Sequence, residues 1–408
     1  MTGDDIFSCT LANGLRVVHI ASNSEVAYCG LAIDAGSRDE AVGKFGLAHF
    51  VEHTIFKGTR RRKAWHIINR MERVGGELNA YTTKEETMVY SVFPCEHFGR
   101  AAELIADLVA NSQFPESELA REREVVLDEV NSYLDSPSEA IYDDFEDMIW
   151  RGSMLGHNIL GIDADLRGIS SEDCRDYLDR LYVPENMVFF ALGKMRHDAV
   201  ARTAERYFGM LGHKLSRGVR VAPAVVPAFH ESRTIDSHQS HTLYGAPVFS
   251  MYDKRRHAMS LLNNILGGPG MNSLLNVAIR ERRGYAYTVE SSLSLLSDCG
   301  LFTIYFGSDA EHVAPSLRLI GNIIDRLATV PLTARALDAA KKQYIGQLRV
   351  ASDSREAQIL GAAKSVMYYN RIGSKEEAAA NIEAVSAAEI MDTAQLLLSA
   401  GASVLTMR

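Results

Sequence analysis

The sequence predicts an α+β protein made of two homologous halves, each a mostly antiparallel sheet packed with helices. The chain of 408 residues is too long for one ordinary core, and its 47% apolar and 23% charged residues are typical of a globular protein. Strand-like alternating segments are interleaved with amphipathic helical segments, and one order of elements occurs twice. We therefore expect two domains, residues 1–220 and residues 221–408.

The first half opens with two strand-like segments, at 14–22 and 26–37. Both are rich in β-branched and aromatic residues, are bounded by Asn, Gly or Ser, and could pair with each other. The stretch GLAHFVEHTIFKGT at 46–59 follows and is expected to contain a helix. A further helix around residues 65–76 is expected to stop at its two final glycines.

The remainder of the first half is expected to contain one more strand and two more helices. Alternation of side chains at 78–93 predicts a strand, and the amphipathic pattern at 95–114 predicts a helix. Pro115 is suited to start another helix, which we expect to run to about residue 135, just before the Ser-Pro pair at 136–137.

The second half repeats this order. Residues 300–348 look like a second copy of residues 86–130, since each reads strand, helix, proline, helix. Pro115 and Pro331 occupy equivalent places, 216 positions apart. This indicates an internal duplication, with the join expected in 215–233, which has two prolines and little periodicity.

Charge and composition exclude several classes of function. A net charge of −9 and a pI near 5.8 argue against a nucleic-acid-binding surface, because phosphate binding needs clustered Lys and Arg. The densest basic run, TRRRK at 59–63, is interpreted as a solvated face at a helix end. No nucleic-acid partner is expected.

The cysteines and the chain start point to the cytoplasm. Five scattered cysteines without a CxxC motif indicate reduced thiols and neither a disulfide framework nor a cysteine zinc site. The first residues are acidic where a signal peptide is basic and then apolar. No run of about 18 apolar residues could span a bilayer, so we expect a cytoplasmic protein with no membrane partner.

The stretch at 46–59 places polar side chains in an apolar segment. On a helix, His49 and His53 are four residues apart and share one face, so their imidazoles can close on one metal ion. Glu52 lies beside that face, where an acid can take a proton from metal-bound water and pass it to a leaving amine. Zinc suits such ligands best. The alternative is a pair of hydrogen-bonded core histidines.

A third ligand is expected from the helix at 117–135. Glu122 and Glu129 are seven residues apart and therefore share a face, with two valines flanking it. A glutamate between valines is costly unless it is paired or binds a cation. The alternative is that both are exposed acids of a charged helix. The second copy has no equivalent His and Glu residues near 261–270, so the fold itself does not need them.

H-x-x-E-H followed 76 residues later by Glu129 resembles the pitrilysin family of inverzincin metallopeptidases, which includes insulysin and the mitochondrial processing peptidase. The resemblance covers nearly the whole chain. Its blocks are AGSRDE, GLAHFVEHTIFKGT, GGELNAYTTKEETMVY, YVPENM and IRERRGYAYTV.

The resemblance implies roles for the first-half residues. His49, His53 and Glu129 would bind one Zn²⁺ per chain, Glu52 would be the general base, and Glu122 would support the ligands. A strand bordered by the segment that includes Glu77, Asn79 and Ala80 would pair with the substrate backbone, which would let one site cleave many sequences.

The resemblance also assigns two residues of the second half. Arg280 and Tyr287 match an Arg-x6-Tyr pair that would hold the substrate carbonyl and stabilise the oxyanion. From the residues alone, Arg280 would only end a helix stopped by Gly284, and Tyr287 would only alternate along a strand. Pro269 stands where many relatives have glycine, which puts loop flexibility near Arg280 in doubt.

The resemblance implies two halves that face each other across a cavity, and a homodimer, because half-length relatives pair. The function expected is that of a zinc-dependent endopeptidase acting on peptides or unfolded segments in an enclosed chamber, with a glutamate-activated zinc water as nucleophile. The alternatives are a non-catalytic scaffold and a processing subunit that needs a partner.

Overall fold

The computed structural model describes residues 6–408 except 213–214 and 216–217. It is an α+β protein with one six-stranded and one five-stranded sheet, so the predicted fold class is confirmed. Two compact units contain these sheets. The first unit comprises 1–131, 157–220 and 352–373, and the second comprises 132–156, 221–351 and 374–408. The division into homologous domains at residue 220 stays a prediction.

The sheet of the first unit has the strand order β1-β2-β6-β3-β5-β4. Neighbouring strands are antiparallel except β2 and β6, which are parallel. The strands are β1 (Ile6–Thr10), β2 (Arg16–Ala21), β3 (Val26–Ile33), β4 (Glu77–Thr82), β5 (Thr87–Pro94) and β6 (Met187–Gly193).

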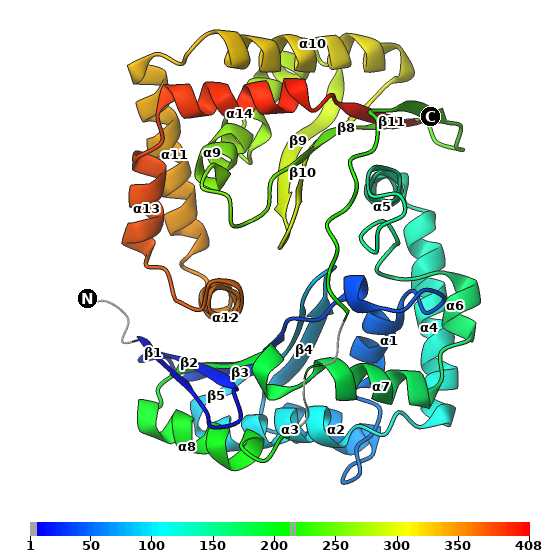
Figure 1. Cartoon of the computed structure of the whole chain (residues 1–408), viewed down its shortest axis with the longest axis vertical. Helices are drawn as coiled ribbons and strands as arrows, with labels where there is room; N and C mark the ends of the chain where they lie inside the picture. Colours follow the sequence, from blue (N-terminus) through cyan, green and yellow to red (C-terminus); the bar gives the residue numbers. More distant parts are fainter. Residues whose placement is uncertain (1–5, 213–214, 216–217) are drawn as a thin grey trace. The chain divides into compact units, whose positions relative to one another are not determined.

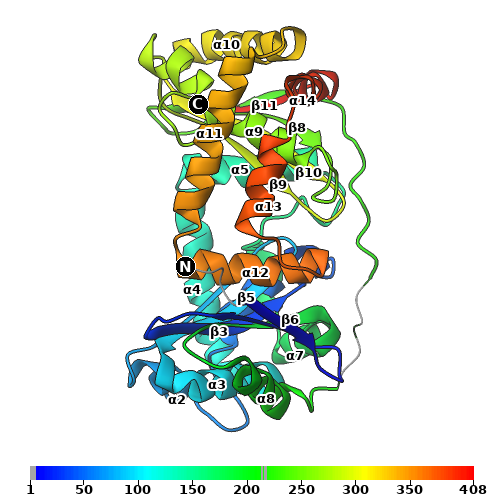
Figure 2. The same ribbon diagram turned by 90° about the vertical axis from the view of Figure 1, so that its left-hand side faces the viewer.

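Both faces of this sheet are buried, because alternate side chains of a strand point to opposite faces. On one face, Val17 and Phe189 belong to a large hydrophobic core that also contains residues from most helices of the unit. On the other face, Val18 and Phe190 pack against a single helix, α12. Figure 2 shows α12 on one side of the strands and α3 and α8 on the other. The helices are α1 (Leu47–Thr54), α2 (Ala64–Glu72), α3 (Phe98–Asn111), α4 (Glu116–Leu134), α6 (Asp163–Arg167), α7 (Ser171–Leu181), α8 (His197–Phe208) and α12 (Arg355–Tyr369).

The sheet of the second unit has the order β7-β11-β8-β10-β9, with β7 and β11 parallel and the other pairs antiparallel. Helices α10 and α14 run side by side in this unit (Figure 1). Its strands are β7 (His230–Arg233), β8 (Ser240–Val248), β9 (Ala286–Leu295), β10 (Gly300–Ser308) and β11 (Ser403–Met407). Its helices are α5 (Pro137–Ile149), α9 (Arg256–Gly267), α10 (Ala310–Thr329), α11 (Ala334–Ala351), α13 (Lys375–Glu383) and α14 (Ala387–Ser399).

The two sheets repeat one topology. Strands β7, β11, β8, β10 and β9 follow the same order and directions as β2, β6, β3, β5 and β4. Helices α5 and α12 are exchanged between the halves of the sequence: α5 packs on β8 and β11, and α12 packs on β2, β3 and β6. Each sheet is therefore covered on one face by a helix from the other half.

Two local expectations were wrong. The segments at 14–22 and 26–37 do not pair with each other, because β6 lies between β2 and β3. The alternating stretch at 78–93 is two strands, β4 and β5, which form a hairpin around residues 83–86. Both outcomes depend on strand partners that a local pattern does not specify. Among the residues that the structure describes, no helix has the length and apolarity needed to cross a membrane.

Candidate metal centre

Helix α1 begins at a position that only glycine suits. Gly46 has φ +92°, a left-handed conformation. A Cβ atom there would lie 2.7 Å from the carbonyl oxygen of Leu160 and 2.8 Å from the Cα atom of Gly161. The loop at 160–161 can therefore pack closely against the start of the helix, which fixes where the helix begins.

A buried carboxylate caps the same helix end. Glu40 accepts hydrogen bonds from the backbone N–H groups of Gly46 (3.0 Å) and Ala48 (2.7 Å), which satisfies donors that a helix start leaves free. Its Oε2 atom also lies 2.9 Å from Nε2 of His157, whose ring stacks on Phe45. Burial raises the pKa of Glu40, and these hydrogen bonds oppose that rise in part.

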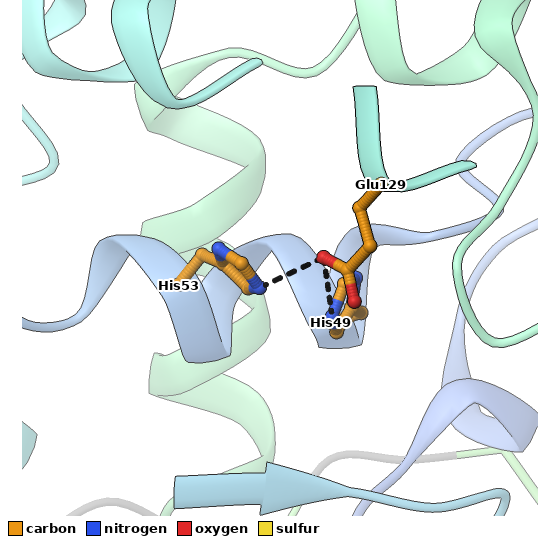
Figure 3. Close-up of side chains that lie close together, drawn as sticks. All are labelled: His49, His53 and Glu129. Carbon is orange, nitrogen blue, oxygen red and sulfur yellow. Dashed lines mark ion pairs between the residues drawn. The ribbon is translucent and has the colours of Figure 1, made fainter. Parts of the chain in front are cut away.

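The i, i+4 spacing on α1 brings the two histidine rings together, with centroids 4.5 Å apart. Glu129 approaches them from α4, and its Oε2 atom lies 3.8 Å from Nε2 of His49 and 3.4 Å from Nε2 of His53. Figure 3 shows both imidazoles directed toward this carboxylate. One ligand atom from each residue lies within 4.8 Å of the others.

This donor set fits zinc. Two tetrahedral ligands at ordinary Zn–N and Zn–O distances are roughly 3.4 Å apart, close to both nitrogen–oxygen separations. Burial, followed by the nearby charge of His53, lowers the pKa of His49 to about 3, so its imidazole is in the neutral form that binds metals. Two imidazoles and one carboxylate leave a fourth tetrahedral position for water or substrate.

The carboxylate of Glu122 contacts the ring nitrogen of His53 that does not face Glu129. Nδ1 of His53 lies 3.1 Å from Oε1 of Glu122, whereas Nε2 on the other side of the ring faces Glu129. The other oxygen of Glu122 pairs with Nζ of Lys57 at 2.6 Å. Lys57, Glu122 and His53 therefore form a chain that fixes the ring orientation of His53 and leaves its Nε2 atom toward Glu129.

Glu52 lies on the same helix and is mostly buried. Burial raises the pKa of Glu52, whereas hydrogen bonds from Thr82 at the end of β4 and the charge of His53 oppose the rise. Together with His53 and Glu122, it lines a cavity of about 320 Å³ that also reaches Leu78 and Ala80 of β4. A carboxylate with a raised pKa beside a metal-binding set is suited to move protons.

The three residues expected at the substrate strand lie on β4. Glu77, Asn79 and Ala80 pair with Val92, Tyr90 and Val89 of β5. Strand β4 is the last strand of its sheet, so its other edge has no strand partner among the described residues. Helix α1 packs against β4, which brings this edge near Glu52.

Arg280 and Tyr287 both lie in the second unit and line one cavity of about 730 Å³. Arg280 belongs to a π-helix, Asn276–Glu281, and Tyr287 lies on the edge strand β9 with 70% of its surface exposed. Pro269 lines the same cavity. A π-helix is rare and occurs often at functional sites, and nothing in the sequence pattern predicted it.

Sequence reasoning missed three residues that shape the centre. Lys57 carries no motif role, yet it pairs with Glu122. Glu40 belongs to the AGSRDE block, but its capping of α1 depends on a loop closure that spacing does not reveal. Thr82 bonds to Glu52 from a neighbouring strand. Lys57 lies three residues beyond the end of α1, so helical spacing gave no signal for its contact with Glu122.

Comparison with known families matches two segments of the chain. The family described as Insulinase (Peptidase family M16) matches residues 16–163, and the Peptidase M16 inactive domain matches residues 168–344. The first segment contains the three candidate ligands, and the second contains Arg280 and Tyr287.

Relatives named uncharacterized zinc proteases align over most of the chain. The protein of Mycobacterium bovis is 32% identical and that of Rickettsia bellii 31%, covering 97% and 96% of this chain and 92% and 95% of theirs. YmxG of Bacillus subtilis is 29% identical over 96% of this chain and 95% of its own.

Two solved structures share the fold, each with a TM-score of 0.91 and coverage of 99% of this chain. They are a protease from Helicobacter pylori (21% identity, 99% of that chain) and a peptidase M16 inactive domain from Pseudomonas fluorescens (19% identity, 98% of that chain). The family matches and the relatives at 31–32% identity show that the chain belongs to the insulinase family of peptidases, family M16, as its motifs had indicated.

Proposed function

We propose that the protein is a zinc-dependent endopeptidase that hydrolyses peptides or unfolded polypeptide segments. The observation that carries the proposal is the approach of two imidazole nitrogens and one carboxylate oxygen within 4.8 Å of one another. Relatives named zinc proteases support the choice of metal and reaction.

His49, His53 and Glu129 would hold one Zn²⁺ per chain. The metal, when bound, would supply a Lewis acid that polarises the scissile carbonyl and acidifies water. Glu52 would take a proton from the attacking water and return it to the departing amine. Glu122, held by Lys57, would keep His53 in its ligating orientation.

The substrate backbone would bind at the free edge of β4, where Glu77, Asn79 and Ala80 lie. Addition of an extended peptide to a sheet edge uses main-chain hydrogen bonds and is therefore tolerant of sequence. Arg280 and Tyr287 would hold the substrate carbonyl and stabilise the oxyanion, since a fixed cation and a phenol suit developing negative charge. The enclosed chamber, the homodimer and the cytoplasmic location stay predictions.

Replacement of Glu52 by glutamine tests the mechanism. The amide keeps the size of the side chain but cannot accept a proton, so we expect peptide cleavage to fall by roughly 10²-fold to 10⁴-fold with zinc still bound. Glu72→Gln is the matched control, because Glu72 lines the same cavity and has no proposed role. Cleavage of a quenched-fluorophore peptide and metal analysis of each protein give the readout.

The outcomes separate the alternatives. Parent-rate cleavage by Glu52→Gln would refute the role of Glu52. A wild-type protein that binds zinc but cleaves no peptide in a diverse library would refute the endopeptidase proposal and indicate a scaffold, or a subunit that needs a partner. Loss of cleavage with a chelator and recovery with added zinc is the result expected for the proposed enzyme.

A further inference from the structure

We propose that an arginine-rich cavity beside α2 binds a small ligand with two or three linked phosphate groups. The cavity has a volume of about 400 Å³ and lies within the first unit. Five of its lining residues are arginines and a sixth is an exposed tryptophan: Arg61, Arg62, Arg70, Arg73, Arg100 and Trp65. The proposal does not depend on the peptidase function.

Two of the arginines are held in place by carboxylates. Arg62 binds Asp107 at 2.5 Å and Glu103 at 2.7 Å, and Arg70 binds Glu103 at 2.9 Å. The side chain of Asp107 is fully buried, so removal of Arg62 would leave a buried charge without its close partner. These two arginines therefore form a rigid wall of the cavity.

The other arginines keep donors for a ligand. Arg73 lies over the ring of Trp65 at 5.0 Å, and Arg100 donates to the carbonyl oxygen of Arg70 at 3.0 Å. Neither forms an ion pair with a carboxylate of the described residues. Arg61 is largely exposed and reaches Asp107 only at 3.8 Å. A guanidinium has five N–H donors, so most donors of these three side chains have no acceptor among the residues that the structure describes.

The charge of the cavity indicates an anion. Three of the five arginines form ion pairs, and within the described part of the chain these pairs involve two carboxylates, Glu103 and Asp107, although the whole chain carries a net charge of −9. Such a local excess of positive charge raises the concentration of anions in a concave site. Guanidinium groups bind phosphate oxygens through paired, charge-assisted hydrogen bonds.

Linked phosphates fit this arrangement better than one isolated anion does. They place several negative charges within a space as small as 400 Å³, where arginines from the loop before α2, from α2 and from α3 converge. Trp65 has 57% of its surface exposed, and an exposed indole can also stack on the base of a nucleotide. Inorganic pyrophosphate and a nucleoside diphosphate share the chemistry that the arginines would recognise.

Tryptophan fluorescence can follow binding. The chain has two tryptophans, and Trp150 is buried whereas Trp65 lines the cavity. We expect a saturable change in emission when pyrophosphate or ADP is titrated at physiological ionic strength, and no change for Trp65→Phe. A larger affinity for ADP would identify a nucleotide as the ligand, and equal affinities would identify the phosphates alone.

The double variant Arg73→Ala/Arg100→Ala tests the assignment. It removes two arginines that pair with no carboxylate, so we expect binding of both probes to weaken at least tenfold, with an unchanged far-ultraviolet circular dichroism spectrum. Arg196→Ala/Arg202→Ala is the matched control, since it removes the same charge from exposed positions around α8. Chelation of metal by phosphates would affect both double variants alike.

Three results would overturn the proposal. They are no emission change at millimolar pyrophosphate or ADP, equal weakening in both double variants, and tighter arginine-dependent binding of a polyglutamate peptide than of either phosphate probe. Should the double variant fail to fold, Arg73→Glu alone provides the test, because the side chain of Arg73 lies on the exposed ring of Trp65 and pairs with no carboxylate in the part of the chain that the structure describes. Unchanged pyrophosphate binding by this variant, measured calorimetrically, would refute the site.

Discussion

At the scale of residues, the two histidines of the candidate centre are held in different ways. Nδ1 of His53 contacts Glu122, which pairs with Lys57, so these two side chains fix the orientation of the His53 ring. Nδ1 of His49 is buried and has no hydrogen-bond partner among the described residues. The orientation of His49 must therefore come from the packing of α1 around it, whereas that of His53 depends on two further side chains.

The chain from Lys57 to His53 leads to a prediction for metal affinity. Lys57→Met removes the cation 2.6 Å from Glu122, so the carboxylate loses the contact that directs its other oxygen to His53. We expect zinc to bind about tenfold more weakly, as is common when a partner of a metal ligand is lost. Competition with a fluorescent chelator measures the affinity.

The control for this variant is Lys44→Met. Lys44 makes the same kind of ion pair, with Asp173 at 2.8 Å, but touches none of the candidate ligands. Equal zinc affinity in wild type and Lys57→Met, or an equal loss in both variants, would show that the lysine does not position Glu122.

Glu40 gives a prediction for the pH dependence of stability. Burial raises the pKa of Glu40 above its ordinary value of 4.5, so the native state keeps a proton where the unfolded chain has lost it. The stability that this proton contributes is complete below pH 4.5 and is lost as pH rises through the raised pKa. Glu40→Gln does not titrate and lacks this component.

We therefore expect the free energy of unfolding of wild type, relative to Glu40→Gln, to decrease as the pH rises from 4.5 through the raised pKa of Glu40. Urea unfolding of both proteins at several pH values measures it. A relative stability that grows with pH would mean that the hydrogen bonds from Gly46, Ala48 and His157 outweigh burial and hold the carboxylate charged.

Sequence reasoning at this scale works where spacing determines proximity. His49 and His53 share a helix face because they are four residues apart, and the structure has their rings in contact. The position of Glu129 beside these histidines does not follow from spacing, because no local pattern determines where α4 lies relative to α1. Contacts such as Lys57 with Glu122 or Thr82 with Glu52 depend on side-chain packing across elements and leave no pattern in the sequence.

At the scale of elements, the start of α1 explains why a short helix can hold a metal-binding set. Gly46 permits the close approach of the loop at 160–161, and Glu40 satisfies the N–H groups at the helix start. The helix spans only Leu47–Thr54, so its position depends on these contacts more than on its own propensity.

Substitution of Gly46 and Gly43 separates the effect of the close loop contact from the effect of the left-handed backbone. Gly46→Ala introduces a Cβ atom 2.7 Å from a carbonyl oxygen at φ +92°, whereas Gly43→Ala meets nothing within 4 Å at φ +83°. We expect Gly43→Ala to lower the free energy of unfolding by about 1 kcal/mol, because alanine is strained in a left-handed backbone conformation. Gly46→Ala should cost about 3 kcal/mol or more, because the loop must also move.

Chemical unfolding and zinc affinity of both variants check this prediction. Gly46→Ala should also weaken zinc binding, since a shifted α1 carries both histidines with it, and Gly43→Ala should leave zinc binding unchanged. Equal costs for the two substitutions would show that the contact with Leu160 does not position the helix.

Element type was easier to predict than element partners. The helix expected at 117–135 is α4, Glu116–Leu134, because Pro115 and the charged pattern define it locally. Strand pairing was not local: β6 comes from residues 187–193 yet lies between β2 and β3. The π-helix at Arg280 also has no sequence signal, since its hydrogen bonds differ from those of an α-helix while its side-chain pattern does not.

At the scale of the whole molecule, the repeated topology accounts for the repeated sequence. The copies at 86–130 and 300–348 contain β5, α3 and α4 in one half and β10, α10 and α11 in the other. The duplication was visible because it preserves order and proline position. The exchange of α5 and α12 was not visible, because an amphipathic helix does not specify which of two similar sheets it covers.

This exchange predicts how fragments of the chain behave. A fragment of residues 1–220 lacks α12, whose Ile359, Ala363 and Val366 are buried against the first sheet. A fragment of residues 221–408 lacks α5, whose Ile141 and Phe145 are buried on the second sheet. Each fragment alone would expose an apolar sheet face, so we expect each to aggregate when it is expressed without the other.

Co-expression should rescue both fragments, because each supplies the helix that the other lacks. We expect a one-to-one complex that co-purifies through a tag on either fragment and unfolds in a single transition. The substitutions Ile359→Asp and Ala363→Asp would place charges against the buried sheet face and should abolish the complex. Ala357→Asp is the control, because it places the same charge at an exposed position of α12 and should leave the complex intact. Fragments that stay monomeric and folded on their own would show that the exchanged helices are dispensable for either sheet.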